Sequence, residues 1–68
     1  MENDENIYLY VMKELDGDIK NEALWIKAYA LSNGDEKQIK PKYIQFRVEE
    51  LKKILELSMF IMMQYNIN

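Results

Sequence analysis

The sequence predicts an all-α protein of three helices, over about residues 4–15, 19–32 and 35 or 41 to 65. Three observations carry this prediction. Apolar residues recur at spacings of three and four, residues 23–31 contain a single polar side chain, and short runs of glycine and capping residues separate the apolar segments. We expect residues 1–68 to form one helical domain, since 68 residues are too few for two.

The first expected helix covers about residues 4–15. Asn3 or Asp4 is its expected N-cap, and acidic residues occupy the first turn, where the helix dipole favours them. A strand over residues 7–12 is the alternative, but a lone strand has no partner in this chain. The helix would bear one apolar stripe, made of Ile7, Tyr8, Val11, Met12 and Leu15.

The second expected helix covers residues 19–32. We expect Gly17 to supply the left-handed residue that ends the first helix, Asp18 to cap the second, and Gly34 to end it. Because only Lys27 is polar in residues 23–31, this helix is apolar on nearly every side. Such a helix needs cover from several directions, so we expect it between neighbours, one of them from another chain.

The third helix has two possible starts. If Asp35 caps it, with Gln38 completing a capping box, Pro41 lies inside the helix, removes a backbone hydrogen bond and kinks it. If the helix begins near Lys40, the proline occupies its favoured first turn. Either way we expect a bend or a break near Lys40. The apolar row of this helix is Ile44, Val48, Leu51, Leu55, Ser58 and Met62.

These patterns predict a core and exclude most cofactors. Without cysteine or histidine the chain lacks the usual ligands of zinc, haem and iron–sulfur clusters, so we expect no cofactor or metal, and three short helices leave little room for a catalytic cleft. We therefore expect that the protein is not an enzyme. The predicted core, sealed by Trp25, consists of Val11, Leu15, Ala23, Ile26, Ala30, Ile44, Val48 and Leu51.

Charge is unevenly distributed along the chain. Residues 1–36 carry nine acidic and three basic side chains, and residues 37–68 carry three acidic and six basic ones. We expect the two halves to attract each other, within or between chains, with Arg47 also reaching Glu50. The alternative is a small regulator that binds nucleic acid with Tyr43 and Phe46 as stacking rings. Its candidate phosphate contacts are Lys37, Lys40, Lys42 and Arg47.

The last part of the chain predicts self-association. No charged side chain follows Glu56, so a helix running to about Tyr65 would expose apolar residues on more than one side. Fully burying each large apolar side chain is worth about 1.5–3 kcal/mol. We therefore expect a homo-oligomer, with a dimer favoured, whose function is protein–protein interaction or assembly. Its expected interface residues are Leu51, Leu55, Ser58, Met59, Ile61, Met62 and Tyr65.

The expected location is the cytoplasm. The first six residues are acidic where an export signal needs a basic start, and the apolar run over 57–63 is shorter than the roughly 20 residues that cross a bilayer. A module that lays residues 57–63 on a membrane surface is a further alternative, although the basic residues that usually flank such a face are missing.

Six short pieces follow a pattern of E-L, L-W-x-K-A, G-D and Y-I-x-x-R-V. They are Glu14-Leu15, Leu24-Trp25, Lys27-Ala28, Gly34-Asp35, Tyr43-Ile44 and Arg47-Val48. This pattern resembles a helical segment of small bacterial proteins of unknown function, over about residues 7–55, and departs from it at Pro41. The resemblance implies a three-helix fold and a bacterial source, and no chemistry. A weaker similarity to one tetratricopeptide-type hairpin involves a single copy, where about three are needed for stability.

Overall fold

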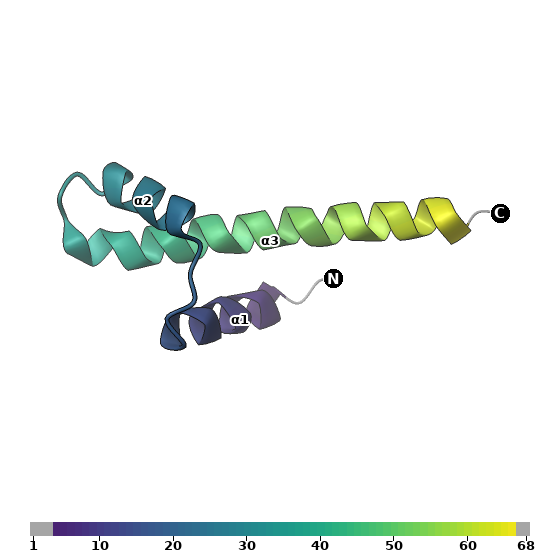
Figure 1. Cartoon of the computed structure of the whole chain (residues 1–68), viewed down its shortest axis with the longest axis horizontal. Coiled ribbons are helices and arrows are strands. Elements are labelled where there is room, and N and C mark those ends of the chain that lie inside the picture. The colour runs from purple at the N-terminus through teal and green to yellow at the C-terminus, as the bar shows by residue number, and fades with distance from the viewer. Residues whose placement is uncertain (1–3, 67–68) are drawn as a thin grey trace.

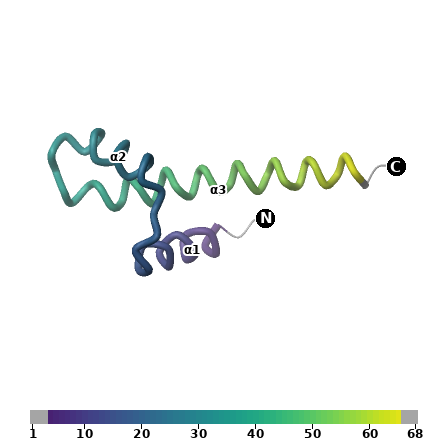
Figure 2. The backbone as a smooth tube through the Cα atoms, viewed as in Figure 1, coloured from purple at the N-terminus to yellow at the C-terminus, as the bar shows by residue number. Residues whose placement is uncertain are grey.

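The computed structural model describes residues 4–66 and confirms the all-α prediction. It contains the helices α1 (Asp4–Asp16), α2 (Glu22–Leu31) and α3 (Glu36–Asn66), with no strand in the described range. Figures 1 and 2 show α1 and α2 against the first half of α3, while the second half of α3 extends beyond both. The described chain is therefore elongated, with extents of 52 × 21 × 20 Å.

The link between α1 and α2 differs from the prediction. Asp18, not Gly17, adopts the left-handed backbone conformation, with a φ of 59°. Asn21, not Asp18, caps α2: its side-chain oxygen accepts a hydrogen bond of 3.2 Å from the Leu24 N–H. The predicted start of the second helix at residue 19 is therefore wrong by three residues. Residues 17–21 lie outside the helices, because they connect α1 to α2 and both of these helices pack on α3 (Figure 2).

The turn between α2 and α3 uses two left-handed residues. Asn33 has a φ of 52° and Gly34 a φ of 84°. Before them, the Ser32 hydroxyl donates a 2.7 Å hydrogen bond to the Ala28 carbonyl, so this buried side chain is satisfied within its own helix. Gly34 thus takes part in ending α2 as predicted, although Asn33 is the first residue of the turn to leave the right-handed region.

The two glycines should respond in opposite directions to replacement by alanine. Gly34 needs its positive φ, so Gly34→Ala is expected to destabilise the fold by about 1 kcal/mol although its added Cβ would meet nothing within 4 Å. Gly17 has no such φ, and its added Cβ would contact the Lys13 carbonyl oxygen at an ordinary 3.5 Å. Gly17→Ala should therefore be neutral or stabilise by up to about 1 kcal/mol. Urea unfolding of both variants checks this; equal midpoint shifts would contradict it.

Asp35 caps the third helix, which begins at Glu36 and is continuous through Pro41. The Asp35 carboxylate accepts a hydrogen bond of 3.0 Å from the Lys37 N–H, and its carbonyl accepts one of 3.0 Å from the Gln38 N–H. The predicted alternative of a break near Lys40 is wrong. Pro41 forfeits the bond to the Lys37 carbonyl, but the buried side chains of Ile39 and Tyr43 hold both flanking turns in place. A local bend at this point stays a prediction.

The core lies where α1 and α2 cover the first half of α3. Trp25, Leu15, Ile44 and Leu51 are half-buried around it, in agreement with prediction. Its buried apolar residues are Val11, Ala28, Ile39, Tyr43 and Val48. The prediction missed Ile39 and Tyr43 because it assigned one apolar row of α3 to the core. With a helix packed on each of two sides, α3 buries a wider arc than one row.

The prediction of the core was wrong for three residues of α2. Ala23, Ile26 and Ala30 are exposed, and Ile26 is exposed to 64%. They lie on the side of α2 that faces away from α3. The face that packs instead contains Leu24, Trp25 and Ala28, and the small Ala28 side chain permits a close approach of the two helices. A helix that is apolar all round has no clear amphipathic face in its sequence, so periodicity could not select the buried one.

Candidate functional site

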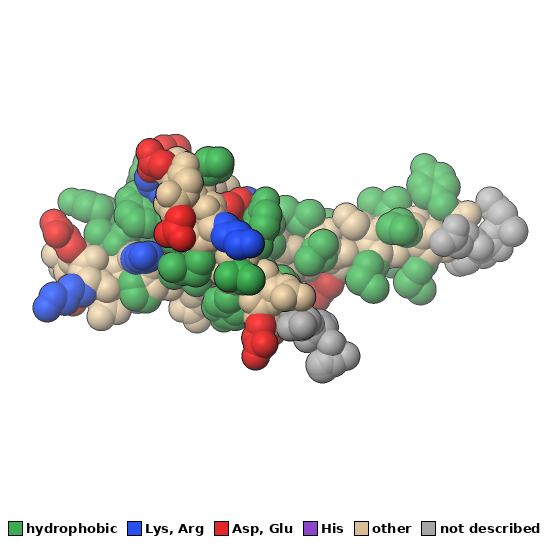
Figure 3. Space-filling model, turned by 90° about the horizontal axis from the view of Figure 1, so that it is seen from below, with side chains coloured by type: hydrophobic (Ala, Val, Ile, Leu, Met, Phe, Trp, Pro, Cys, Tyr) green, Lys and Arg blue, Asp and Glu red, His purple; other side chains and the backbone are tan. Residues whose placement is uncertain are grey.

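The second half of α3 is the most conspicuous surface of the molecule. We call residues 54–65 the C-terminal arm. Its large apolar side chains are all exposed to between 49% and 77%, and they are Ile54, Leu55, Leu57, Met59, Phe60, Ile61, Met62, Met63 and Tyr65. In the space-filling view, hydrophobic side chains occur along the visible face of the part of α3 that extends beyond α1 (Figure 3). No charged side chain follows Glu56 in this arm.

The predicted interface residues divide between the faces of this arm. At about 100° per residue, one face of α3 contains the row that we call the arm stripe: Leu51, Leu55, Ser58, Met62 and Tyr65. Ile61 lies beside this row, and Met59 lies about 100° from Ser58, on the flank. Leu51 is half-buried and the other six predicted residues are exposed. The sequence therefore indicated the C-terminal arm correctly as an apolar region, and in the structure no other helix covers this arm within the described residues.

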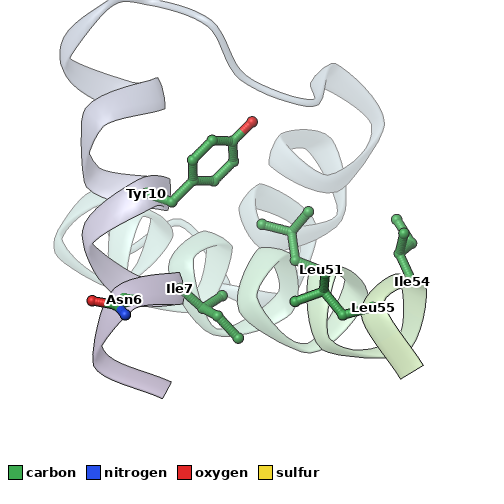
Figure 4. A pocket seen from close by; sticks show the side chains of 6 residues that line it. All are labelled: Asn6, Ile7, Tyr10, Leu51, Ile54 and Leu55. Carbon is green, nitrogen blue, oxygen red and sulfur yellow. The ribbon is translucent and has the colours of Figure 1, made fainter. Parts of the chain in front are cut away.

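A hollow adjoins the arm beside the N-terminal half of α1. We call this hollow, of about 300 Å³, the α1–α3 groove. Figure 4 shows side chains from both helices around it, and these are Asn6, Ile7, Tyr10, Leu51, Ile54 and Leu55. Sequence reasoning missed the contribution of α1. The spacing of three between Ile7 and Tyr10 could have indicated it, but Tyr10 lay outside the predicted apolar stripe.

The helix α2 also exposes large apolar side chains. Ile26, Tyr29 and Leu31 are exposed to 64%, 61% and 51%. Among the described helices, only α3 packs against α2. The expected cover of α2 from a further neighbour is thus not supplied by α1.

The basic cluster around Pro41 is partly neutralised within the chain. The Arg47 guanidinium makes two hydrogen bonds with the Glu14 carboxylate, of 3.1 and 2.9 Å, and one of 2.6 Å with Glu50, as predicted for Glu50. Lys52 pairs with Asp4 at 3.2 Å. Charges of the two halves of the chain therefore do meet within one molecule. Lys37 and Lys40 are exposed and Lys42 is half-buried.

The ion pair of Arg47 shifts the pKa values of both partners. The hydrogen bonds from Arg47 lower the pKa of Glu14 below its ordinary value, against the opposing effect of burial, and the bonds to Glu14 raise the pKa of Arg47. Both side chains are largely enclosed, with exposures of 11% for Glu14 and 17% for Arg47. This pair fastens α1 to α3 next to the core, so its role here is structural.

We expect Glu14→Gln to change the acid stability of the protein. A carboxyl whose pKa is lower in the folded state stabilises the fold above its unfolded pKa, and this contribution is lost as the pH falls through the folded value. Near pH 7 the free energy of unfolding of the variant should be lower by about 1.5–3 kcal/mol, since hydrogen bonds to a charged group are replaced by weaker ones. The difference in free energy of unfolding between the natural protein and the variant should become smaller below about pH 4.5. Urea titrations at several pH values measure it; a pH-independent gap would contradict this assignment.

The aromatic rings named as possible base-stacking groups are not both available. Tyr43 is fully buried, its ring lies 5.4 Å from that of Trp25, and its hydroxyl accepts a 3.0 Å hydrogen bond from the Asn21 N–H. Phe46 is half-buried, with the Lys27 ammonium 4.7 Å from its ring centre. The nucleic-acid hypothesis stays a prediction, but it loses Tyr43 as a ring and Arg47 as an unneutralised cation.

Two further observations bear on function. No helix within residues 4–66 has the length and apolar character needed to span a membrane. Comparison of the chain with family models, with curated proteins and with solved structures finds no match. The resemblance to small bacterial helical proteins stays a prediction, and the exposed surface of this chain is the observation that bears on function.

Proposed function

We propose that this protein is a small protein–protein interaction module that associates with itself through the C-terminal arm. The observation that carries the proposal is the exposure of nine large apolar side chains on one helical segment, residues 54–65, in which Glu56 is the single charged residue. Monomeric proteins seldom expose contiguous apolar patches larger than a few hundred Å². A dimer is the proposed form, and the cytoplasm is the proposed location, with which the lack of cysteine is compatible.

The total exposed area supports a partner of similar size. The chain exposes 5609 Å². A compact monomer of 8.2 kDa is expected to expose roughly 4,500 Å². The excess, on the order of 1,000 Å², is close to the roughly 800 Å² that each partner buries in a standard interface. A second copy can supply a matching apolar surface, because its own arm carries the same uncharged residues.

Sedimentation equilibrium of the full chain over a wide concentration range tests this proposal. The average mass should approach that of two chains as the concentration rises. Added salt should leave the association unchanged or strengthen it, because its contacts are apolar, whereas binding to nucleic acid weakens steeply with salt. A well-folded species of 8.2 kDa at the highest concentration would contradict self-association. Flotation with phospholipid vesicles would then test whether the arm binds lipid instead.

A further inference from the structure

We infer that two copies pair through antiparallel C-terminal arms and that each copy places its Tyr65 in the α1–α3 groove of the other. This inference rests on the proposed self-association and adds the orientation, the register and the occupant of the groove. It follows from the spacing of the arm stripe, from the position of the N-terminal part of α1 on α3, and from the chemistry of the groove.

The arm stripe has the spacing of a coiled-coil seam. Its residues, Leu51, Leu55, Ser58, Met62 and Tyr65, follow one another in steps of four, three, four and three. This seven-residue repeat keeps one face of a helix turned towards a partner helix when the two wind around each other. Leu51 and Leu55 also line the α1–α3 groove, so the seam runs into the groove without interruption.

The position of α1 limits how far a partner helix can extend along this face. Val48, one turn before the groove, is only 3% exposed, and Asp4 of α1 is bound to Lys52. A partner helix lying on the arm stripe can thus reach the level of Leu55 without displacing α1. If Tyr65 of the second copy lies at that level, residues whose numbers sum to 120 face each other.

This register gives well-matched layers. Leu55 faces Tyr65, and Ser58 faces Met62, so a small side chain opposes a large one at the centre. One heptad closer to the core, Tyr65 would lie at the level of Val48, which is already buried in the core. One heptad further away, Met62 and Tyr65 would be the only stripe residues left in the overlap. The register with Tyr65 at Leu55 is therefore the longest overlap that leaves α1 in place.

The same obstacle favours the antiparallel orientation. Helices in a seam lie about 8–10 Å apart, and each helix with its side chains is about 10–12 Å wide. In a parallel pair, both copies of α1 would lie at the same level on the facing sides of the two α3 helices and would compete for one space. In an antiparallel pair, each α1 meets the free end of the partner arm instead, and the interface is closed by two-fold symmetry.

The groove suits a tyrosine side chain. Its lining is almost wholly apolar, so the ring of a tyrosine can pack on Ile7 and Leu55 while the phenol hydroxyl stays at the open side of the groove in contact with water. At about 300 Å³ it is at the lower end of the size range of small-molecule pockets. Among the described residues, Tyr65 is the most exposed large apolar side chain, at 77%.

Disulfide cross-linking of single-cysteine variants tests the register, because the natural chain has no cysteine to interfere. Ser58→Cys, Met62→Cys and Phe60→Cys are prepared separately in the full chain. Phe60 is two residues from both other positions, on the opposite side of the helix, and so provides the matched control. Each variant is oxidised alone and in equal mixtures with each of the others, using oxidised glutathione, and circular dichroism confirms that each is folded.

The mixture of Ser58→Cys with Met62→Cys should form a covalent dimer at least about ten-fold faster than either variant alone, since only that pair meets across the seam. Rapid cross-linking of each variant with itself would overturn the antiparallel register while leaving self-association standing. Dominant cross-linking of Phe60→Cys would overturn the choice of face. A monomer mass in sedimentation, with no covalent dimer in any mixture, would contradict the proposed function as well.

Tyr65→Ala tests the occupant of the groove. This change should weaken association at least about ten-fold, whereas Tyr65→Phe should retain most of it because the ring still fills the groove. Sedimentation equilibrium measures both variants. Unchanged association of Tyr65→Ala, with the Ser58–Met62 cross-link still forming, would show that the arms pair without Tyr65 in the groove and would overturn that part of the inference.

Discussion

Tyr43→Ala is expected to abolish most of the stability of this protein. Tyr43 is fully buried, its ring packs on Trp25, and its hydroxyl receives the Asn21 N–H at the start of α2. Removing a large buried aromatic side chain lowers the free energy of unfolding by about 3–5 kcal/mol, and the whole free energy of unfolding of a small domain is only about 5–15 kcal/mol. The variant should lose most of its helical circular dichroism at room temperature or unfold at a much lower urea concentration.

Tyr43→Phe is the matched control for this experiment. It keeps the ring and removes only the hydroxyl that accepts the hydrogen bond from Asn21, so we expect a loss of about 0.5–1.5 kcal/mol. All three proteins should be compared at one concentration, since self-association adds to apparent stability. If Tyr43→Ala and Tyr43→Phe unfold at the same urea concentration, the assignment of this ring as the centre of the core is wrong.

The second large effect concerns association. Met62→Lys should weaken self-association at least about a hundred-fold, because it removes roughly 1.5–3 kcal/mol of apolar burial in each copy and places a charge in the seam. The fold of each chain should be retained, since Met62 is 62% exposed and lies beyond the core. Sedimentation equilibrium measures the change in Kd, and circular dichroism verifies the helical content.

Phe60→Lys serves as the control for Met62→Lys. Phe60 has a similar exposure, 58%, but lies two residues from both Ser58 and Met62 and therefore on the far side of α3. We expect the control to weaken association by less than about ten-fold, the cost of losing peripheral contacts. Equal weakening by both substitutions would mean that the arm is covered all round, as in a larger bundle, and would contradict a two-helix seam.

The helical segments and most of their ends could be predicted from local residues. Asp35 caps α3, Gly34 takes part in ending α2, and the acidic first turn of α1 begins at Asp4, because capping depends on neighbours within a few positions. The start of α2 could not be predicted in this way. Asn21 and Asp18 are both good caps, and the choice between them depends on the contact of the Asn21 N–H with Tyr43, 22 residues away.

The candidate site was predicted in part. The absence of charge after Glu56 located the C-terminal arm, because a charge-free helical end is visible in sequence. The α1–α3 groove was not predicted, since it requires Ile7 and Tyr10 of α1 to lie beside Leu51 and Ile54 of α3. Similarly, the pairing of Arg47 with Glu50 follows from helical spacing, whereas its bond to Glu14 joins residues 33 positions apart.

By itself, the sequence determined three helices, their approximate limits and an apolar end that no charge interrupts, because each of these depends on spacings within a single turn or a single segment. Only the tertiary structure decided which face of α2 is buried, why α3 continues through Pro41 and that Tyr43 fills the core. An evenly apolar helix presents several equivalent faces, and the free energy that selects one comes from packing against residues distant in the chain.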